Sequence, residues 1–564
     1  MRLTILDMIV VGAYLISMAA IGIYQARKIK NTGDFFAGGR GFNKFLMMMH
    51  ALGTGTHADD PVGVMGAAYK YGLAGIWYTF VYLFVTPFYW IMAPLFRRSR
   101  YLTTADFFEA RFGKSLGLLY AIMGTVTFSV NMGTLLKGTG TIVKYVTHGQ
   151  VSDLTAILGM TIVFVIYGTL GGLMATVFTE SVQGLLIVVM SVLLVPFGLS
   201  KIGGFAGLHQ LLTPDKFSLH TAPEMLEVSL PWIIAGSVMA LIGIVSQPHT
   251  MEVCSTGKTE FEGRVGFTYG NFIKRFCAIA WAFTGLIVLA MVAKGSVPAL
   301  GAEREGAFGT AIRSLLQPGF IGLMFAAILA AQMSTLSAFM VAGSALLSRN
   351  IFKKHIHRAA SDQLVLQVAR VAGLLIVGLG MLFALKVQSV ADAIQYFWAI
   401  STLTGVFMWA GVIWRRTTSV GAWASFIVMT TIWILLGPIG KALHDGGYFT
   451  AIAWLGQFGD KKMLASLVLS YLPAGIVVLV LVSLLTKPLA KDVLDKFYLL
   501  IKTPVGQEDK LVEAGVDVVY AGQNKPHPWE TKYPRLVNIG GFFVALAISF
   551  AFLGFLYLLS RIGG

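Results

Sequence analysis

Apolar stretches recur along the whole chain, and each is long enough to cross a lipid bilayer. A window of about 20 residues, the length that spans the hydrocarbon core, marks about 14 of them. Only 12% of the residues are charged, whereas soluble domains carry roughly 25%. We therefore predict an all-α polytopic membrane protein, with spans at residues 5–25, 44–70, 73–96, 117–145, 152–171, 180–203, 230–248, 275–294, 319–348, 368–388, 391–413, 419–438, 463–486 and 535–560.

Basic residues are distributed unevenly between the predicted loops. Most of the 43 Lys and Arg residues fall in every second loop or at the adjoining span ends, including Lys274 and Arg275, and Lys137 lies in the middle of a predicted span. Because positively charged loops stay in the cytoplasm, we expect a multi-pass protein of the cell membrane with both termini outside. The net charge of +16 then reflects topology. It favours contact with anionic lipid headgroups and not with nucleic acid.

The second span has a polar centre between apolar flanks. Residues 53–63 contain three glycines, His57, Asp59, Asp60 and Pro61. Ionisable groups are costly in hydrocarbon, and freed backbone groups there need partners in protein or in a water-filled cavity. Pro61 has no N–H to donate, so it frees an upstream carbonyl and favours a break in the helix. We interpret this span as a broken helix that forms a binding site for a cation or a polar solute.

The sequence gives little sign of enzyme chemistry, and its one formal GxSxG, Gly113–Gly117, lies in a basic loop without the preceding strand that a nucleophile elbow needs. There is no HExxH metal helix and no Walker-type phosphate loop. The two cysteines, Cys254 and Cys277, show no metal-ligand spacing. We expect no enzymatic activity and no organic cofactor.

One soluble segment of appreciable size is predicted, at residues 487–533. Within it Val493, Leu494, Phe497 and Leu500 recur at helical spacing, opposite charged residues, until Pro504 ends the pattern. We expect an amphipathic helix lying against the cytoplasmic face.

Several short motifs follow one another in the order and spacing of a known family. They are Asp34–Arg40, Thr103–Phe112, Tyr167–Leu173 with the following Thr176, Thr179, Glu180 and Gln183, Gln247–His249, Ala330–Ser337 and Ser348–Phe352. Together they resemble the sodium:solute symporter family over nearly the whole chain. That family includes sodium-coupled proline, pantothenate, iodide and sugar transporters, with the inverted-repeat fold of the bacterial leucine transporter.

The resemblance implies a fold and a function. The expected core is a 5+5 inverted repeat, which divides the chain into residues 1–43, a first repeat at 44–203, a second repeat at 204–413, peripheral helices at 414–486, the segment 487–533 and a last helix at 534–564. The expected activity is secondary active transport, in which inward sodium movement drives uptake of a small organic solute by alternating access. The solute would bind where two discontinuous helices, near Ala58 and near Gly243–Gln247, meet at mid-membrane, with sodium beside it. Sodium is then the coupling ion. The sequence leaves the solute and the oligomeric state open.

The resemblance also implies a sodium site. Its oxygens would come from the carbonyls of Ala58, Pro61 and Ala331, if the last helix opens locally, and from the hydroxyls of Ser334 and Thr335. Hydroxyls and free carbonyls suit a hard monovalent cation without the desolvation penalty of several carboxylates. The alternative is that both hydroxyls bond the carbonyl one turn back in their own helix.

A second group of residues is expected to serve coupling or substrate binding. Lys137 needs a counter-charge, which Asp59 or Asp60 could supply, although a purely structural ion pair is the alternative. Glu180 stands where the family usually has Asp. It is either a group near the sodium region or a helix N-terminal acid. The remaining candidates are Ser246, Gln247, Gln395 and Trp398.

Two other functions stay open at this point. A proton-coupled carrier would use Asp59, Asp60 and His57 in place of sodium, although His50 and His57 fit packed, hydrogen-bonded positions better than proton relays. A transporter-like solute sensor would use the same site for signalling.

Overall fold

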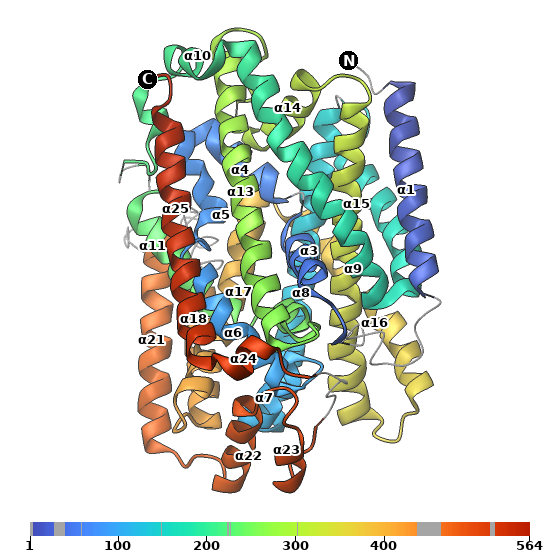
Figure 1. The fold of residues 1–564 in the computed structure, drawn as a ribbon, viewed down its shortest axis with the longest axis vertical. Helices are drawn as coiled ribbons and strands as arrows, with labels where there is room; N and C mark the ends of the chain where they lie inside the picture. Colours follow the sequence, from blue (N-terminus) through green and yellow to red (C-terminus); the bar gives the residue numbers. More distant parts are fainter. Residues whose placement is uncertain are drawn as a thin grey trace.

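The protein forms a bundle of helices that run mostly along its long axis (Figure 1). The computed structural model describes residues 4–26, 40–57, 59–147, 149–222, 225, 227–301, 303–436, 464–518 and 525–564. Within these ranges the regular structure is helical, and the one β-type contact is an isolated bridge between Phe42 and Gly257. The all-α class predicted from the sequence is confirmed.

The first half of the chain contains the first broken helix and the longest helix. Its helices are α1 (Ile5–Ala26), α3 (Lys44–Gly55), α4 (Asp59–Tyr71), η2 (Gly72–Ile76), α5 (Trp77–Phe80), α6 (Thr86–Ser99), α7 (Thr104–Phe112), α8 (Lys114–Val146), α9 (Asp153–Ile202), α10 (Gly204–Leu211) and η3 (Pro214–Phe217).

The second half begins with another broken helix. It contains α11 (Leu230–Ile244), α12 (Pro248–Ser255), α13 (Glu260–Ala293), η5 (Arg304–Gly306), α14 (Ala307–Leu315), α15 (Phe320–Ala345), η6 (Leu346–Ile356), α16 (Asp362–Lys386), α17 (Val390–Ile413), α18 (Ser419–Ile434), α21 (Leu464–Leu485), α22 (Lys491–Lys502), α23 (Asp509–Glu513), α24 (Pro528–Lys532), η9 (Leu536–Gly540) and α25 (Gly541–Arg561).

Every predicted span coincides with helix, but not every boundary is right. Among the described residues, seven helices are long and apolar enough to cross a membrane, or eight if the bent pair α11 and α12 is one span. The count of 14 therefore stays a prediction. The loop expected between spans 152–171 and 180–203 is wrong, because α9 is helical without interruption from Asp153 to Ile202.

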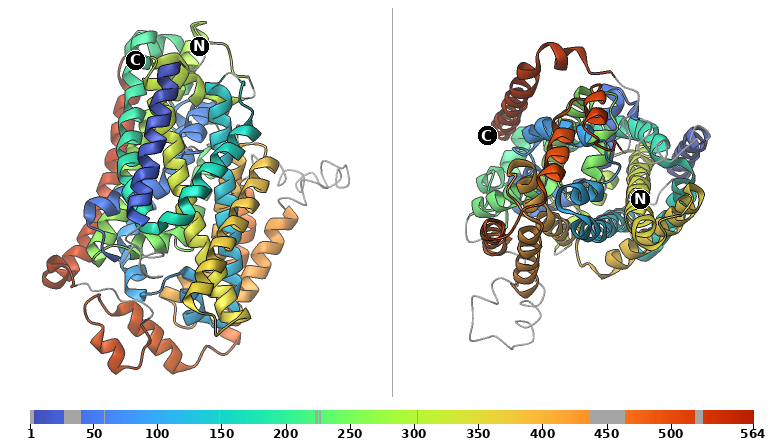
Figure 2. Two further views of the ribbon diagram at one scale, coloured as in Figure 1. Left: turned by 90° about the vertical axis from the view of Figure 1, so that its right-hand side faces the viewer. Right: turned by 90° about the horizontal axis from the view of Figure 1, so that it is seen from below.

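The two ends of the chain lie at the same end of the molecule, and α22 and α23 lie at the opposite end (Figures 1 and 2). The helix expected after residue 490 is present as α22. Leu494, Phe497 and Leu500 are buried in it as expected, but Val493 is 39% exposed, and Tyr498 and Ile501 complete the packed face instead. Phe497 packs on Phe107 of α7, with ring centroids 5.1 Å apart.

Helix α13 packs very closely on α3. A side chain at Gly270 would place its first carbon 2.5 Å from the carbonyl oxygen of Met48, and one at Gly266 would lie 2.4 Å from Met47. These two glycines form a small-residue spacing of four on one helix face, which lets backbones in membrane proteins approach closely. The close approach brings the middle of α13 next to the first helix break.

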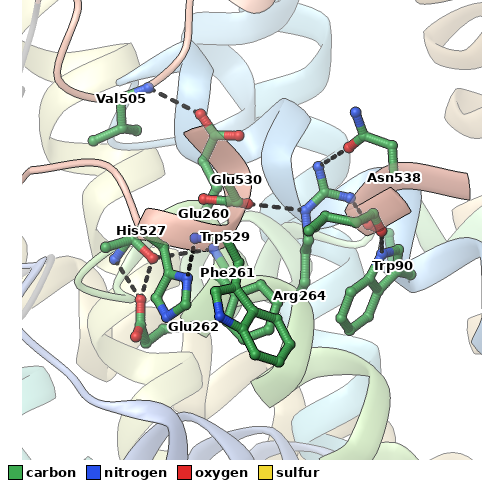
Figure 3. Close-up of polar contacts among 12 residues, drawn as sticks. Trp90, Glu260, Phe261, Glu262, Arg264, Val505, His527, Trp529, Glu530 and Asn538 are labelled. Atoms are coloured by element: carbon green, nitrogen blue, oxygen red, sulfur yellow. Dashed lines mark hydrogen bonds and ion pairs between the residues drawn. The ribbon is translucent and has the colours of Figure 1, made fainter. Parts of the chain in front are cut away.

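A group of hydrogen bonds and a ring contact joins the start of α13 to the segment that precedes α25 (Figure 3). Every guanidinium nitrogen of Arg264 has a partner: Nη1 donates to the Trp90 carbonyl (2.7 Å), Nε to Glu530 (3.2 Å) and Nη2 to the Asn538 side chain. His527 stacks on Phe261 with centroids 4.4 Å apart. We call Arg264, Phe261, His527, Glu530 and Asn538 the tail clip.

Candidate functional site

The first helix break separates α3, which ends at Gly55, from α4, which begins at Asp59. Thr56 ends α3 in an extended conformation, with φ −131° and ψ 112°. Asp59, Asp60 and Pro61 then form the first turn of α4, where acids are favoured by the free N–H groups and the helix dipole. The backbone N–H of His57 donates to Asp60 (3.2 Å). The predicted broken helix is confirmed, although Ala58 itself lies outside the described residues.

The second break separates α11 from α12, which are bent by 60°. Pro248 starts α12, and the residue before a proline is disfavoured in the helical region. Accordingly, Gln247 is extended, with φ −67° and ψ 125°. This break agrees with the second discontinuous helix expected near Gly243–Gln247.

A cavity with both polar and apolar walls lies where the two breaks meet, and its volume is about 90 Å³. It extends between α3, α4, α5, α6, α8, α11, α12, α13 and α17. Its charged and histidine side chains are His57, Asp59, Asp60, His249, Lys274 and Arg275, and its aromatic ones are Tyr78, Tyr82, Tyr89, Phe267, Phe397 and Trp398. We call this cavity the central pocket.

The acids of the central pocket are paired with cationic or hydrogen-bonding groups. The Nδ1 atom of His57 lies 3.0 Å from Asp59 and its Nε2 atom lies 2.8 Å from the Thr54 carbonyl. Because both partners are acceptors, both contacts are hydrogen bonds only when the ring carries two protons. The Lys274 ammonium lies 2.8 Å from Asp60 and also donates to the Gly55 carbonyl.

Distances within this group would also allow a metal ion, because ligand atoms of His57, Asp59 and Asp60 lie within 4.8 Å of one another. The Lys274 ammonium already provides the positive charge beside Asp60. We therefore interpret the group as a hydrogen-bonded ion-pair network.

Asp60 pairs with a cation from α13. That partner is Lys274, which the sequence had placed in a loop beside a span starting at residue 275. Helix α13 begins at Glu260, so Lys274 lies four turns inside it. Arg275, 2% exposed, is likewise in the helix and in the pocket.

Glu180 lies in the interior of α9 and not in its first turn, because α9 begins at Asp153. Its carboxylate contacts His50 Nδ1 (2.6 Å) and accepts a hydrogen bond from the Thr54 hydroxyl (3.1 Å), fully buried behind the first break. The helix N-terminal interpretation of this acid is wrong. His50 is packed and hydrogen-bonded, as expected.

Of the expected sodium ligands, Thr335 of α15 contacts the end of α3 next to the first break. Thr335 is buried, and its hydroxyl donates to the carbonyl of Gly53 in α3 (3.1 Å). Helix α15 is continuous through Ala331, Ser334 and Thr335, so no local opening is present at Ala331. Pro61 lies buried in the first turn of α4.

The remaining candidates divide into two groups. Gln247 and Trp398 line the central pocket, and Gln247 Nε2 lies 3.4 Å from the Tyr82 hydroxyl. Ser246 instead donates to the Ser401 carbonyl (2.7 Å) and joins α11 to α17. Gln395, Lys137 and Glu180 are not among the residues that line the pocket.

One sequence signal could have revealed Lys274 and Arg275. Thr259 and Glu262 form a capping box, the reciprocal bond pattern that begins a helix. Reading it as the start of a helix would have placed both cations inside the span. The hydropathy window passed over them because charged residues lower its mean.

A family model matches residues 35–428 of the chain and describes the sodium:solute symporter family. The chain belongs to this family. It is 26% identical to the osmoregulated proline transporter OpuE of Bacillus subtilis (strain 168), over 76% of this chain and 88% of the relative. It is also 26% identical to the sodium/pantothenate symporter of Escherichia coli (strain K12), over 76% of this chain and 89% of the relative.

A solved structure of a Na+-coupled sialic acid symporter, in a substrate-bound outward-open state, has a similar fold. The TM-score is 0.70 at 16% identity, over 86% of this chain and 99% of that one. At this identity the likeness shows the fold alone.

Proposed function

We propose that the protein is a secondary active transporter that couples inward sodium movement to uptake of a small organic solute by alternating access. The observation that carries this proposal is the central pocket at the junction of two broken helices. Unwound backbone at membrane depth is tolerated where it is buried in protein or lines a cavity. In carriers such breaks bind solute and coupling ion.

Sodium would bind beside the pocket, at the first break. Its ligands would be the carbonyls of Ala58 and Pro61, the hydroxyls of Ser334 and Thr335 and, if α15 opens locally when the ion binds, the carbonyl of Ala331. The Thr335 hydroxyl supports this assignment, because it already contacts the end of α3 and not only its own helix. An ion held between α3, α4 and α15 would fix these helices relative to one another.

Coupling then follows from linkage. If sodium stabilises the conformation that captures the solute from outside, solute and ion raise each other's affinity by the same factor. The proposed division into two inverted five-helix repeats, 44–203 and 204–413, would let one set of helices move against the other around the pocket. In this proposal both chain termini lie outside the cell and α22–α24 in the cytoplasm.

Uptake into proteoliposomes tests the proposal. A panel of radiolabelled sugars, amino acids and carboxylates is offered under an inward sodium gradient, and then under an inward proton gradient without a sodium gradient. We expect uptake of one solute class under the sodium gradient only. Uptake under the proton gradient alone would favour the proton-coupled carrier and contradict the assignment of sodium.

A further inference from the structure

Arg275 is a buried arginine in the central pocket whose guanidinium is only partly satisfied. It is 2% exposed and lines the pocket from α13. Among the described residues, its Nε and Nη1 atoms have no hydrogen-bond partner. The face of Tyr82 lies 5.6 Å from the guanidinium carbon, which supports the cation but accepts no hydrogen bond in the guanidinium plane. A buried guanidinium with unsatisfied N–H donors is energetically costly unless a ligand accepts hydrogen bonds from them and supplies a negative charge.

The charges that line the pocket also favour an anion. Asp59 and Asp60 are matched by His57 and Lys274 at 3.0 and 2.8 Å. Arg275 has no ion pair of its own among the described residues: Asp60, which lies close enough to act on it, is paired with Lys274, and the Arg275 side chain is hydrogen-bonded to the neutral Tyr89. With His57 neutral the lining groups sum to zero, and with His57 protonated they are positive. Adding a sodium ion beside the pocket makes the closed site positive in either case.

We propose that the transported solute is a small organic acid whose carboxylate binds Arg275. This proposal rests on the function proposed above and names the substrate class of the same site. A planar carboxylate matches the donor geometry of a guanidinium, and it brings the single negative charge that offsets the sodium ion. The organic part of the acid would lie against Ile244, Ile394, Phe397 and Trp398, which supply the apolar wall of the pocket.

Thermal-shift measurements on the purified full-length protein test this proposal with matched probes. Pyruvate, L-lactate and benzoate are each compared with the corresponding amide, in NaCl and in KCl. The amides keep the shape of the acids and remove the charge. We expect stabilisation by at least one acid in NaCl, and no stabilisation by its amide.

Variants then assign the effect to Arg275. Arg275→Gln should lower the affinity for the acid by about ten- to a hundredfold, which is the cost of losing hydrogen bonds to a charged group. Arg275→Lys keeps the charge and should lower the affinity for the acid less than Arg275→Gln does. Lys294→Gln is the matched control, because it removes an exposed cation at the end of the same helix. If Arg275→Gln does not fold, Arg275→Lys against Lys294→Gln still tests the assignment.

The outcomes separate this proposal from the proposed function. Equal stabilisation by acid and amide, or an unchanged acid affinity in both Arg275 variants, would overturn the carboxylate assignment while leaving sodium coupling intact. Acid stabilisation that is equal in NaCl and KCl, but lost in Arg275→Gln, would support carboxylate recognition and contradict sodium coupling.

Discussion

Two arginines on the same helix, Arg264 and Arg275, are held in opposite ways. Arg264 lies in the tail clip, where all three guanidinium nitrogens have partners (Figure 3). Arg275 lies about three turns further along α13, buried in the central pocket with two nitrogens unpartnered. The difference separates a side chain that joins parts of the fold from one placed to meet a ligand. It also predicts different consequences of removing each charge.

The largest effect is expected for Lys274, the cation that the pocket does match. Lys274→Met leaves Asp60 beside His57 without its ammonium, and breaking a buried ion pair costs about 3–5 kcal/mol. The double variant Lys274→Met with Asp60→Asn removes both charges and should recover part of that loss. Thermal unfolding in a detergent of fixed composition measures both. A single variant as stable as the double variant would contradict the pairing.

Removing each arginine in turn tests directly whether the two have different roles. Arg264→Gln should destabilise the protein by about 2–3 kcal/mol, because it leaves the partly buried Glu530 without its cation. Arg275→Gln should change the stability of the ligand-free protein by less than about 1 kcal/mol, since it removes an unmatched buried charge. Hydrogen–deuterium exchange should rise in residues 528–538 for the first variant only. Equal destabilisation by both would show that Arg275 is also structural.

The smallest effect concerns pH and the tail clip. Burial, and then the nearby Glu260 carboxylate, raise the pKa of Glu530 from 4.5 to about 7, although Arg264 acts against this. The docked acid therefore binds protons more tightly than the released one between these values. Docking of α24 is strengthened as pH falls from about 7 toward 4.5 and weakened as pH rises, by on the order of 1 kcal/mol between pH 8 and pH 6.

Hydrogen–deuterium exchange of α24, corrected for the intrinsic effect of pH, measures this dependence. Exchange should be slower at pH 6 than at pH 8 in the wild type. In Glu530→Gln, which cannot ionise, the difference should disappear. Pro528–Lys532 exchange that is independent of pH in the wild type would show that the carboxyl does not titrate in this range.

The sequence predicted the helical class, the break before Asp59 and the one at Gln247 because proline and glycine act locally on the backbone. It failed for Lys274 and Glu180, whose partners are distant in the chain: Asp60 and His50 lie 214 and 130 positions away. A hydropathy average falls wherever charged residues cluster, so the predicted span boundary was placed after Lys274. The two cations of the pocket, Lys274 and Arg275, were therefore assigned to a loop. Ion pairs across helices depend on packing, here on the close contact of Gly266 and Gly270 with α3.

Sodium binding at the first break is the central claim, and Thr335 allows the most direct test of it. Binding of radioactive sodium to the purified protein is measured by scintillation proximity for wild type, Ser334→Ala and Thr335→Val. The control is Thr284→Val, a buried threonine whose hydroxyl bonds the carbonyl one turn back in α13 (2.8 Å). We predict that Ser334→Ala and Thr335→Val each lower the affinity for sodium by about five- to a hundredfold, because losing a buried hydrogen-bonding or ligand partner costs about 1–3 kcal/mol. The control variant should bind sodium with wild-type affinity. Wild-type sodium affinity in both variants would contradict the account.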